Sequence, residues 1–181
     1  SRAKSYLSGA VLALVLAGAS APAIMDQYLL EKESSGVTPL KAYQDGARIW
    51  TVCDGKTEGV TRSTVMTKAQ CDAWRQTEIG QRLQHVHSII KVPMSEPAWA
   101  GVGSWCFNVG NAGCAKSTTV KLINHGQQAA GCKAILRWRF ITRDGKKIDC
   151  STEQPYCPGV WDRRNGEAEL DIDRITDWFQ I

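Results

Sequence analysis

The spacing of apolar residues predicts a mainly helical chain. Residues 67–90 carry a stripe of apolar side chains at helical spacing, formed by Ile79, Leu83, Val86 and Ile90. Thr67 and Gln70 stand at the start of this stripe in a capping-box pattern. Start and stop signals predict further helices over residues 26–34, 95–109, 117–124, 127–140 and 160–170.

A small β region is predicted before the long helix. Residues 48–53 are rich in β-branched and aromatic side chains, and the Asp54-Gly55 dipeptide that follows is a hairpin signal. A second turn or hairpin is expected around Asp144-Gly145. These elements predict the α+β class, with a small β-hairpin lobe and a mainly helical lobe.

The N-terminal segment contains an uncharged run over residues 6–25. Its twenty residues would span about 30 Å as a helix, the hydrocarbon thickness of a bilayer. Half of them are Ala, Gly or Ser, so such a helix would insert only weakly. Arg2 and Lys4 precede the run and an acidic segment follows it, an order that favours export of the rest of the chain.

Three interpretations of this run are open. Small-x-small triplets between residues 17 and 23 would suit a cleaved signal peptide. The run would otherwise be a permanent anchor, or a weak anchor that is exported uncleaved and later leaves the bilayer. The last is favoured because the run is weakly apolar. The expected division is therefore a membrane segment over residues 1–25 and a folded domain over residues 26–181.

Composition and charge exclude several classes of protein. The chain is 43% hydrophobic and its 16 glycines lack a collagen period, which excludes disordered and collagen-like proteins. A net charge of +4 is too small to indicate a nucleic-acid-binding protein, but it suits transient contacts with an anionic polymer.

The seven cysteines point to export rather than to a metal site. They form no C-x-x-C pair and no Cys/His cluster at zinc-finger spacing, so no metal is expected. The close spacing of Cys106 and Cys114, and of Cys150 and Cys157, predicts short disulfide-closed loops in an oxidising compartment.

Candidate chemistry is concentrated between Glu33 and Thr51. Glu33 follows a predicted helix, Asp45 lies in a polar loop, and Thr51 lies in the predicted strand. Inverting glycoside hydrolysis needs one acid that protonates the leaving oxygen and further polar groups that position and activate a water. Acids near loops are common, so this pattern alone is weakly specific.

Longer motifs raise the specificity. Residues 43–45 read Y-Q-D, residues 104–113 read SWCFNVGNAG, and residues 158–167 read PGVWDRRNGE. With Trp50-Thr51 and the S-T and I-N-H-G segments of residues 117–126, these resemble, in the same order, the motifs of phage lysozymes of glycoside hydrolase family 24. Joined to a weak N-terminal anchor, they resemble the signal-anchor-release subgroup of phage endolysins.

The resemblance implies a lysozyme-like fold and a cofactor-free muramidase. Its substrate would be peptidoglycan, cleaved at the β-1,4 bond between N-acetylmuramic acid and N-acetylglucosamine. Glu33 would be the general acid, and Asp45 and Thr51 would orient and activate the attacking water. Trp50 and Asn108 would contact the substrate. The enzyme is expected to be a monomer without a nucleic-acid partner, anchored at the periplasmic face of the host inner membrane and later released to the periplasm.

Two features depart from the family pattern. Eleven residues separate Glu33 from Asp45, about three more than is usual, although loops tolerate extra length at small entropic cost. An insertion in this loop, with Glu33 keeping the acid role, is favoured over loss of the catalytic acid. Glu31 is the alternative candidate for the acid. The subgroup also has a cysteine after the R-R-x-x-E helix, where this chain has Asp171 and an unfamiliar tail.

The missing cysteine leaves an odd thiol. If Cys53 pairs with Cys71, and the two closely spaced pairs form as expected, Cys132 is left over. On the last predicted helix, Arg163 and Arg164 are interpreted as a surface pair that bridges to Glu167, which is favoured over a position near the acid.

Two other functions remain open. A lytic transglycosylase uses a single acid and makes an anhydro product. A noncatalytic wall-binding or inhibitor domain would have kept the fold and lost the acid, which the longer loop after Glu33 would suit.

Overall fold

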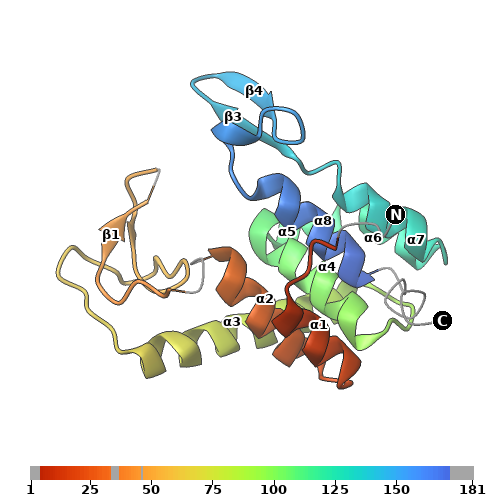
Figure 1. The fold of residues 1–181 in the computed structure, drawn as a ribbon, viewed down its shortest axis with the longest axis horizontal. Coiled ribbons are helices and arrows are strands. Elements are labelled where there is room, and N and C mark those ends of the chain that lie inside the picture. Colours follow the sequence, from red (N-terminus) through yellow and green to blue (C-terminus); the bar gives the residue numbers. More distant parts are fainter. Residues whose placement is uncertain (1–4, 34–36, 46, 172–181) are drawn as a thin grey trace.

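The computed structural model describes residues 5–33, 37–45 and 47–171 and has two lobes (Figure 1). In this part of the chain the helices are α1 (Gly9–Leu16), α2 (Ala21–Glu33), α3 (Lys68–Ile89), α4 (Glu96–Val109), α5 (Asn111–Ala115), α6 (Thr118–Asn124), α7 (Gln128–Ile135) and α8 (Val160–Asp171). The strands are β1 (Tyr43–Gln44), β2 (Trp50–Thr51), β3 (Phe140–Arg143) and β4 (Lys146–Asp149). The predicted α+β class is confirmed.

Helix α4 is the centre of the helical lobe. The Ser95 side chain caps it by accepting a hydrogen bond from the Ala98 backbone, and its residues from Ala98 to Cys106 are buried. It packs against α2, α3 and α8, and Trp105 is fully buried among them. At Gly103 an added Cβ would lie 2.8 Å from Leu83, so the absence of a side chain allows this close packing.

The N-terminal run folds as two helices rather than one. Helix α1 ends at Leu16, Gly18 adopts a φ of 70°, and α2 begins at Ala21 and continues past the predicted boundary at residue 25. Val11 and Ile24 are fully buried in the main core. Among the described helices, none combines the length and apolar character that crossing a bilayer requires.

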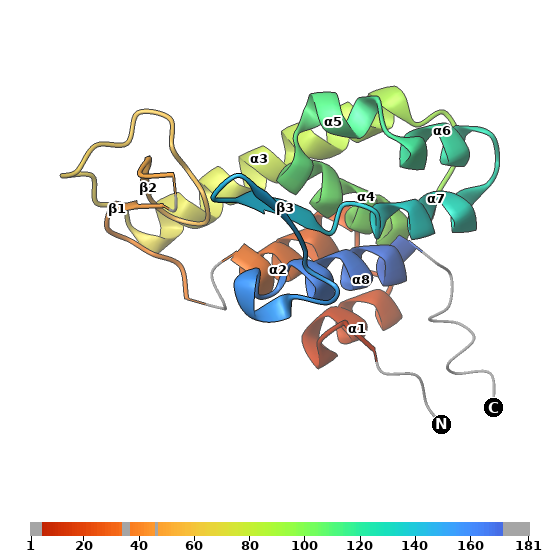
Figure 2. The ribbon, with the colours of Figure 1, turned by 90° about the horizontal axis from the view of Figure 1, so that it is seen from above.

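The β1–β2 lobe contains its own small core. Tyr43 pairs with Thr51 across the two antiparallel strands, and Val52 forms an isolated bridge with Lys56 around the predicted Asp54-Gly55 turn. Val52, Cys53 and Cys71 form a buried cluster that is separate from the core of the helical lobe. Helix α3 runs from this lobe into the helical lobe in both ribbon views (Figures 1 and 2).

A second hairpin, β3–β4, replaces the end of a predicted helix. The helix expected over residues 127–140 ends at Ile135, because Phe140 pairs with Asp149 in the antiparallel ladder instead. Asp144 and Gly145 both have positive φ angles, which is the geometry of a tight hairpin turn. The predicted turn at this dipeptide is therefore confirmed.

Three disulfides join the cysteine pairs that the sequence analysis considered: Cys53–Cys71, Cys106–Cys114 and Cys150–Cys157. The first ties the β1–β2 lobe to the start of α3. The third closes the loop between β4 and α8. Cys132 is buried in α7 and lies outside these three disulfides.

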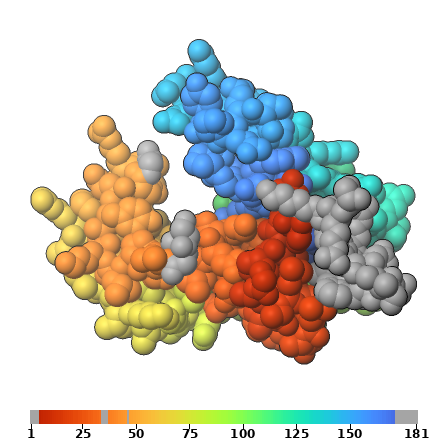
Figure 3. Space-filling view, viewed as in Figure 1, coloured from red at the N-terminus to blue at the C-terminus, as the bar shows by residue number. Residues whose placement is uncertain are grey.

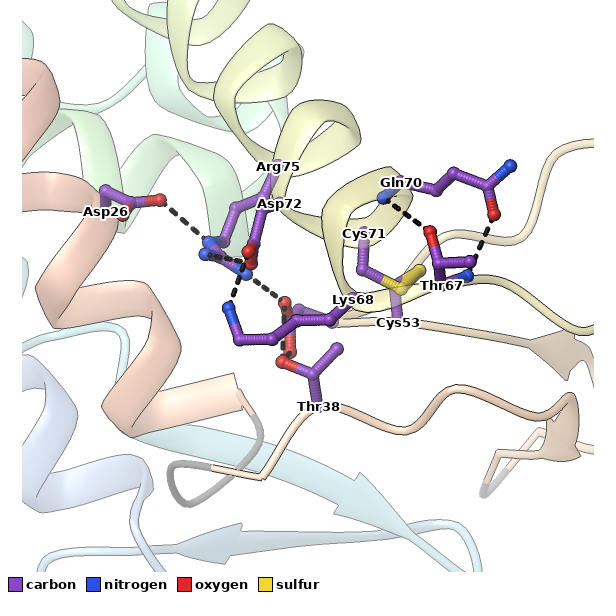
Figure 4. Close-up of polar contacts among 10 residues, drawn as sticks. Asp26, Thr38, Cys53, Thr67, Lys68, Gln70, Cys71, Asp72 and Arg75 are labelled. Atoms are coloured by element: carbon purple, nitrogen blue, oxygen red, sulfur yellow. Dashed lines mark hydrogen bonds and ion pairs between the residues drawn. A yellow bond between two sulfur atoms is a disulfide. The ribbon is translucent and has the colours of Figure 1, made fainter.

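A buried arginine links the two lobes (Figure 4). Arg75 of α3 is 3% exposed, and its guanidinium pairs with Asp54 of the β1–β2 lobe at 2.6 Å and with Asp26 of α2 at 2.8 Å. It also pairs with Asp72, and Thr38 donates a hydrogen bond to Asp54. Burial alone lowers the pKa of Arg75, but the hydrogen bonds that Arg75 donates to Asp26 and Asp54 outweigh it and raise the pKa. The network therefore connects α2, α3 and the small lobe through charged groups.

Candidate active site

Glu33 is the last residue of α2 and lies at the junction of the two lobes. Its side chain is 24% exposed, and Arg163 of α8 donates a hydrogen bond from Nη1 to its Oε1 at 2.5 Å. The two residues are 130 positions apart in the chain. This ion pair fixes the direction of the Glu33 carboxyl group at the C-terminal end of α2.

Arg163 is itself held by a buried network within the helical lobe. Its Nε donates to Oε1 of the fully buried Glu167 at 3.0 Å, and the Ser104 hydroxyl donates to the same oxygen at 2.9 Å. Arg164 pairs with the other oxygen of Glu167. Burial by itself lowers the pKa of Arg163, but the negative charges of Glu167 and Glu33 outweigh it, so its pKa is raised.

This network corrects the interpretation of the two arginines as a surface pair. Arg163 and Arg164 do bridge to Glu167, but they are only 7% and 3% exposed. They are buried because α8 packs against α4, which brings Ser104 next to Glu167. The charge pattern of a single helix does not reveal which of its faces becomes covered.

Asp45 and Thr51 lie on either side of the turn between β1 and β2. Oδ1 of Asp45 accepts hydrogen bonds from the backbone of Ala47 and Ile49, both at 2.9 Å. The Thr51 hydroxyl donates to the Ile49 carbonyl at 3.0 Å, and Thr51 is 3% exposed. Both side chains are therefore oriented by the backbone of the same residue, Ile49.

A hollow separates the small lobe from the β3–β4 hairpin. Figure 3 shows the surface hollowed between the β1–β2 lobe and the β3–β4 hairpin, above the end of α2. Partial burial raises the pKa of Tyr43 in β1, and the charges of Asp45, Glu33 and Asp54 raise it further. Tyr43 therefore lies within the electrostatic influence of both candidate carboxylates.

The remaining candidate residues occupy different surroundings. Trp50 is partly buried in β2. Asn108 is exposed near the end of α4 and accepts a hydrogen bond from Arg164. Glu31 accepts hydrogen bonds from Ser8 at 2.7 Å and from Gln27 at 2.8 Å, so its carboxylate contacts the start of α1. The catalytic and substrate-binding roles stay predictions.

The contact of Arg163 with Glu33 matches the less favoured of the two interpretations of this residue, a position near the acid. The pattern R-R-x-x-E at residues 163–167 was its only signal, and that pattern carries no information on a partner in another helix. For the described residues, no group of three or more His, Cys, Asp or Glu side chains is arranged to hold a metal ion.

Comparison with known proteins gives independent evidence for the family of this chain. The family model described as phage lysozyme matches residues 32–167. The SAR-endolysin of Escherichia phage 933W is 42% identical over 169 residues, covering 91% of this chain and 92% of that protein. The SAR-endolysin of Escherichia phage N15 is 41% identical over 175 residues, covering 92% and 94%.

A solved structure supports the same fold. The endolysin of Escherichia coli O157:H7 phage FAHEc1 is similar with a TM-score of 0.69 and 22% sequence identity, over 96% of each chain. At that identity the likeness concerns the fold.

Proposed function

Because this chain belongs to the phage lysozyme family and is a lysozyme, we propose that it is an endolysin that hydrolyses the β-1,4 bond between N-acetylmuramic acid and N-acetylglucosamine. Cleavage of this bond in peptidoglycan would lyse the host cell. The observation that carries the proposal is the Glu33–Arg163 ion pair, which holds a carboxyl group at the hollow between the two lobes.

The proposed mechanism assigns one role to each lobe. Glu33, on the helical lobe, donates its proton to the glycosidic oxygen as the bond breaks. Asp45, on the small lobe, orients the attacking water and stabilises positive charge on the sugar, and the Thr51 hydroxyl holds that water. Preorganisation of Asp45 and Thr51 by Ile49 supports this assignment, since a water must be held on the face of the sugar opposite the acid.

The longer loop after Glu33 is compatible with this role. Position 36, where the usual spacing would put the acid, is a glycine and cannot donate a proton. Glu33 is the nearest preceding acid, and Arg163 pairs with it rather than with Glu31. The ion pair therefore supports insertion in the loop over loss of the acid.

Substitution of the two acids tests the assignment. Glu33→Gln is expected to abolish peptidoglycan lysis, by about a thousandfold or more, because the amide has no proton to donate. Glu31→Gln, two residues away on α2, is the matched control and is expected to retain activity. Full activity of Glu33→Gln with loss in Glu31→Gln would move the acid to Glu31.

Product analysis separates the alternative functions. Mass spectrometry of the released muropeptides is expected to find reducing ends. Anhydro ends would identify a lytic transglycosylase, and absence of cleavage by the folded wild-type protein would identify a noncatalytic wall-binding domain.

The proposed enzyme acts as a monomer and without nucleic acid, which sedimentation of the purified protein tests.

We also propose that residues 1–25 hold the newly made enzyme at the periplasmic face of the host inner membrane until it is released to the periplasm. The names of the 933W and N15 relatives and the weak apolar character of the run support this. In the folded chain Leu7, Val11 and Met25 are buried in protein, so release need not expose them to water. While it is anchored, the enzyme is expected to be inactive. If protein anchored in vesicles cleaved external peptidoglycan at the same rate as released protein, this expectation would be contradicted.

A further inference from the structure

The β3–β4 hairpin and the three residues before it concentrate positive charge outside the groups assigned above. Residues 137–149, here called the basic hairpin, contain five basic residues and two acidic ones. Their net charge of +3 compares with +4 for the whole chain of 181 residues, so the rest of the chain is close to neutral. Most of the net charge that could attract an anionic polymer therefore lies in one short segment.

The hairpin presents these charges to solvent on both of its faces. Arg143 pairs with Lys146 next to the turn, and the neighbouring pair on the opposite face is Thr142 with Lys147. These three basic residues are exposed. Lys147 Nζ lies 4.3 Å from the centre of the Phe140 ring, which is itself 38% exposed.

The contacts that these charges make within the fold are weak and lie at an exposed surface: Arg143 donates a hydrogen bond to the Tyr156 carbonyl at 3.3 Å, and Lys147 lies over the Phe140 ring. Like charges that face each other across antiparallel strands destabilise the pair, and Arg143 and Lys146 stand in that relation. In contrast, Arg139 pairs with Asp149 at 3.0 Å at the base of the hairpin, where the ion pair can support the ladder. The charges near the turn therefore suit a partner outside the chain.

The basic hairpin stands beside the proposed active site. The loop that follows it is closed by the Cys150–Cys157 disulfide and leads into α8, which supplies Arg163 to Glu33. The hairpin and the β1–β2 lobe lie on opposite sides of the hollow at the end of α2 (Figures 1 and 3). A polymer that crosses the hollow at Glu33 therefore passes next to the hairpin.

We propose that the basic hairpin binds the carboxylate groups of the peptide stems that peptidoglycan carries on its muramic acid residues. This rests on the proposed function, because it makes the hairpin a subsite for the same substrate. The stems are anionic and hang from the sugar next to the cleaved bond, so their carboxylates would meet Arg143, Lys146 and Lys147 while the glycan lies at Glu33. Lysine and arginine form charge-assisted hydrogen bonds with such groups.

The test compares charged and neutralised substrate. The triple variant Arg143→Gln, Lys146→Gln, Lys147→Gln is assayed on soluble peptidoglycan strands. A second substrate has its amines acetylated and its stem carboxylates converted to methylamides. On charged strands the variant is expected to show a KM raised about tenfold, the combined effect of three exposed ion pairs of ordinary strength. The kcat is expected to stay within about twofold, since none of the three residues touches Glu33.

A matched variant controls for total charge. Lys116→Gln, Lys121→Gln, Lys133→Gln removes three exposed lysines from the region of α5, α6 and α7. It is expected to change the KM less than about twofold, because exposed charges farther away than a Debye length of about 8 Å are screened. An equal rise of KM in both triple variants, or an equal rise on charged and methylamidated strands, would overturn the proposal.

A binding measurement separates this proposal from the proposed function. Cosedimentation of the full chain with intact sacculi at 4 °C is expected to weaken about tenfold in the hairpin variant and to remain unchanged in the control variant. If the wild-type protein produced no new reducing ends, the proposed muramidase function would be refuted. Cosedimentation would still test whether the basic hairpin binds peptidoglycan. Unchanged cosedimentation with reduced binding to phosphatidylglycerol vesicles would assign the surface to a membrane and refute the proposal.

Discussion

Arg163 is the residue whose surroundings depend most on distant parts of the chain. Its guanidinium pairs with Glu33 of α2 and with Glu167 of its own helix, and its backbone carbonyl accepts a hydrogen bond from Tyr28 at 2.7 Å. Burial raises the pKa of Tyr28 far above 10, so this phenol remains a donor. Arg163 thus joins the candidate acid to the interior of the helical lobe.

Arg163→Gln is expected to lower kcat by about 10- to 100-fold with little change of KM, because a small displacement of a reacting group has an effect of this order. Arg163→Lys keeps the charge and is expected to recover part of the loss. Steady-state kinetics on soluble peptidoglycan measures both values. Thermal unfolding curves ensure that each variant is assayed well below its melting temperature.

Comparison of Arg163→Gln with Arg163→Lys distinguishes a role of Arg163 in positioning Glu33 from a role in the stability of the fold. A merely structural role would lower the fraction of folded enzyme and leave the kcat per folded molecule unchanged. That outcome, with equal values for wild type and Arg163→Gln after correction for folding, would contradict the role of Arg163 in orienting Glu33.

At the scale of elements, the arrangement of α2, α3 and the β1–β2 lobe depends on few connections. The two apolar cores are separate, and the Cys53–Cys71 disulfide and the Arg75 network join the small lobe to α3. Arg75 also reaches Asp26, on the helix that ends at Glu33. The charged network therefore connects the helix that carries the candidate acid, Glu33, with the lobe that carries Asp45 and Thr51.

Arg75→Met is expected to lower the free energy of unfolding by about 3–5 kcal/mol, since it leaves the buried Asp54 without its cation. The double variant Arg75→Met, Asp54→Asn is expected to lose less than the sum of the single variants, by more than about 1 kcal/mol. Urea unfolding of the disulfide-intact protein measures these values.

Lys68 supplies the control on the same helix. It pairs with Asp72, and its side chain is 76% exposed. Lys68→Gln is expected to cost less than about 1 kcal/mol, as exposed ion pairs generally do. Similar losses for Lys68→Gln and Arg75→Met, or strict additivity of the double variant, would show that the buried network does not hold the lobes together.

At the scale of the whole molecule, the N-terminal segment is part of the folded enzyme. Helix α1 lies against α2, and Val11 is fully buried in the same core as Trp105. Two residues further along α1, Ala13 is exposed. The N-terminal segment thus has distinct buried and exposed positions in the folded chain.

Val11→Asp is expected to destabilise the folded enzyme by several kcal/mol, because it buries a carboxylate without a partner. Ala13→Asp places the same charge in the same apolar run but at an exposed position, and is expected to change stability by less than about 1 kcal/mol. Thermal unfolding in the absence of detergent compares the two. Equal melting temperatures for both variants would contradict packing of α1 on the domain.

Local sequence signals predicted the local parts of this fold well. The Thr67 and Gln70 side chains form the expected capping box at the start of α3, and Asp144-Gly145 forms the expected turn. Each depends on contacts within a few residues, so the sequence contains all of the interacting groups. The prediction that the helix continues beyond Ile135 was wrong, because cross-strand pairing with residues 146–149 determines the structure of residues 140–143.

The sequence by itself determined the family, the α+β class, the capping box that begins α3 and the candidate residues Glu33, Asp45 and Thr51. Only the tertiary structure decided that Arg163 and Arg164 are buried, that Arg163 meets Glu33, and that Arg75 joins both lobes. The physical reason is the range of the interactions. Caps and turns form between neighbours in the chain, whereas the burial of a charge depends on which helices pack over it.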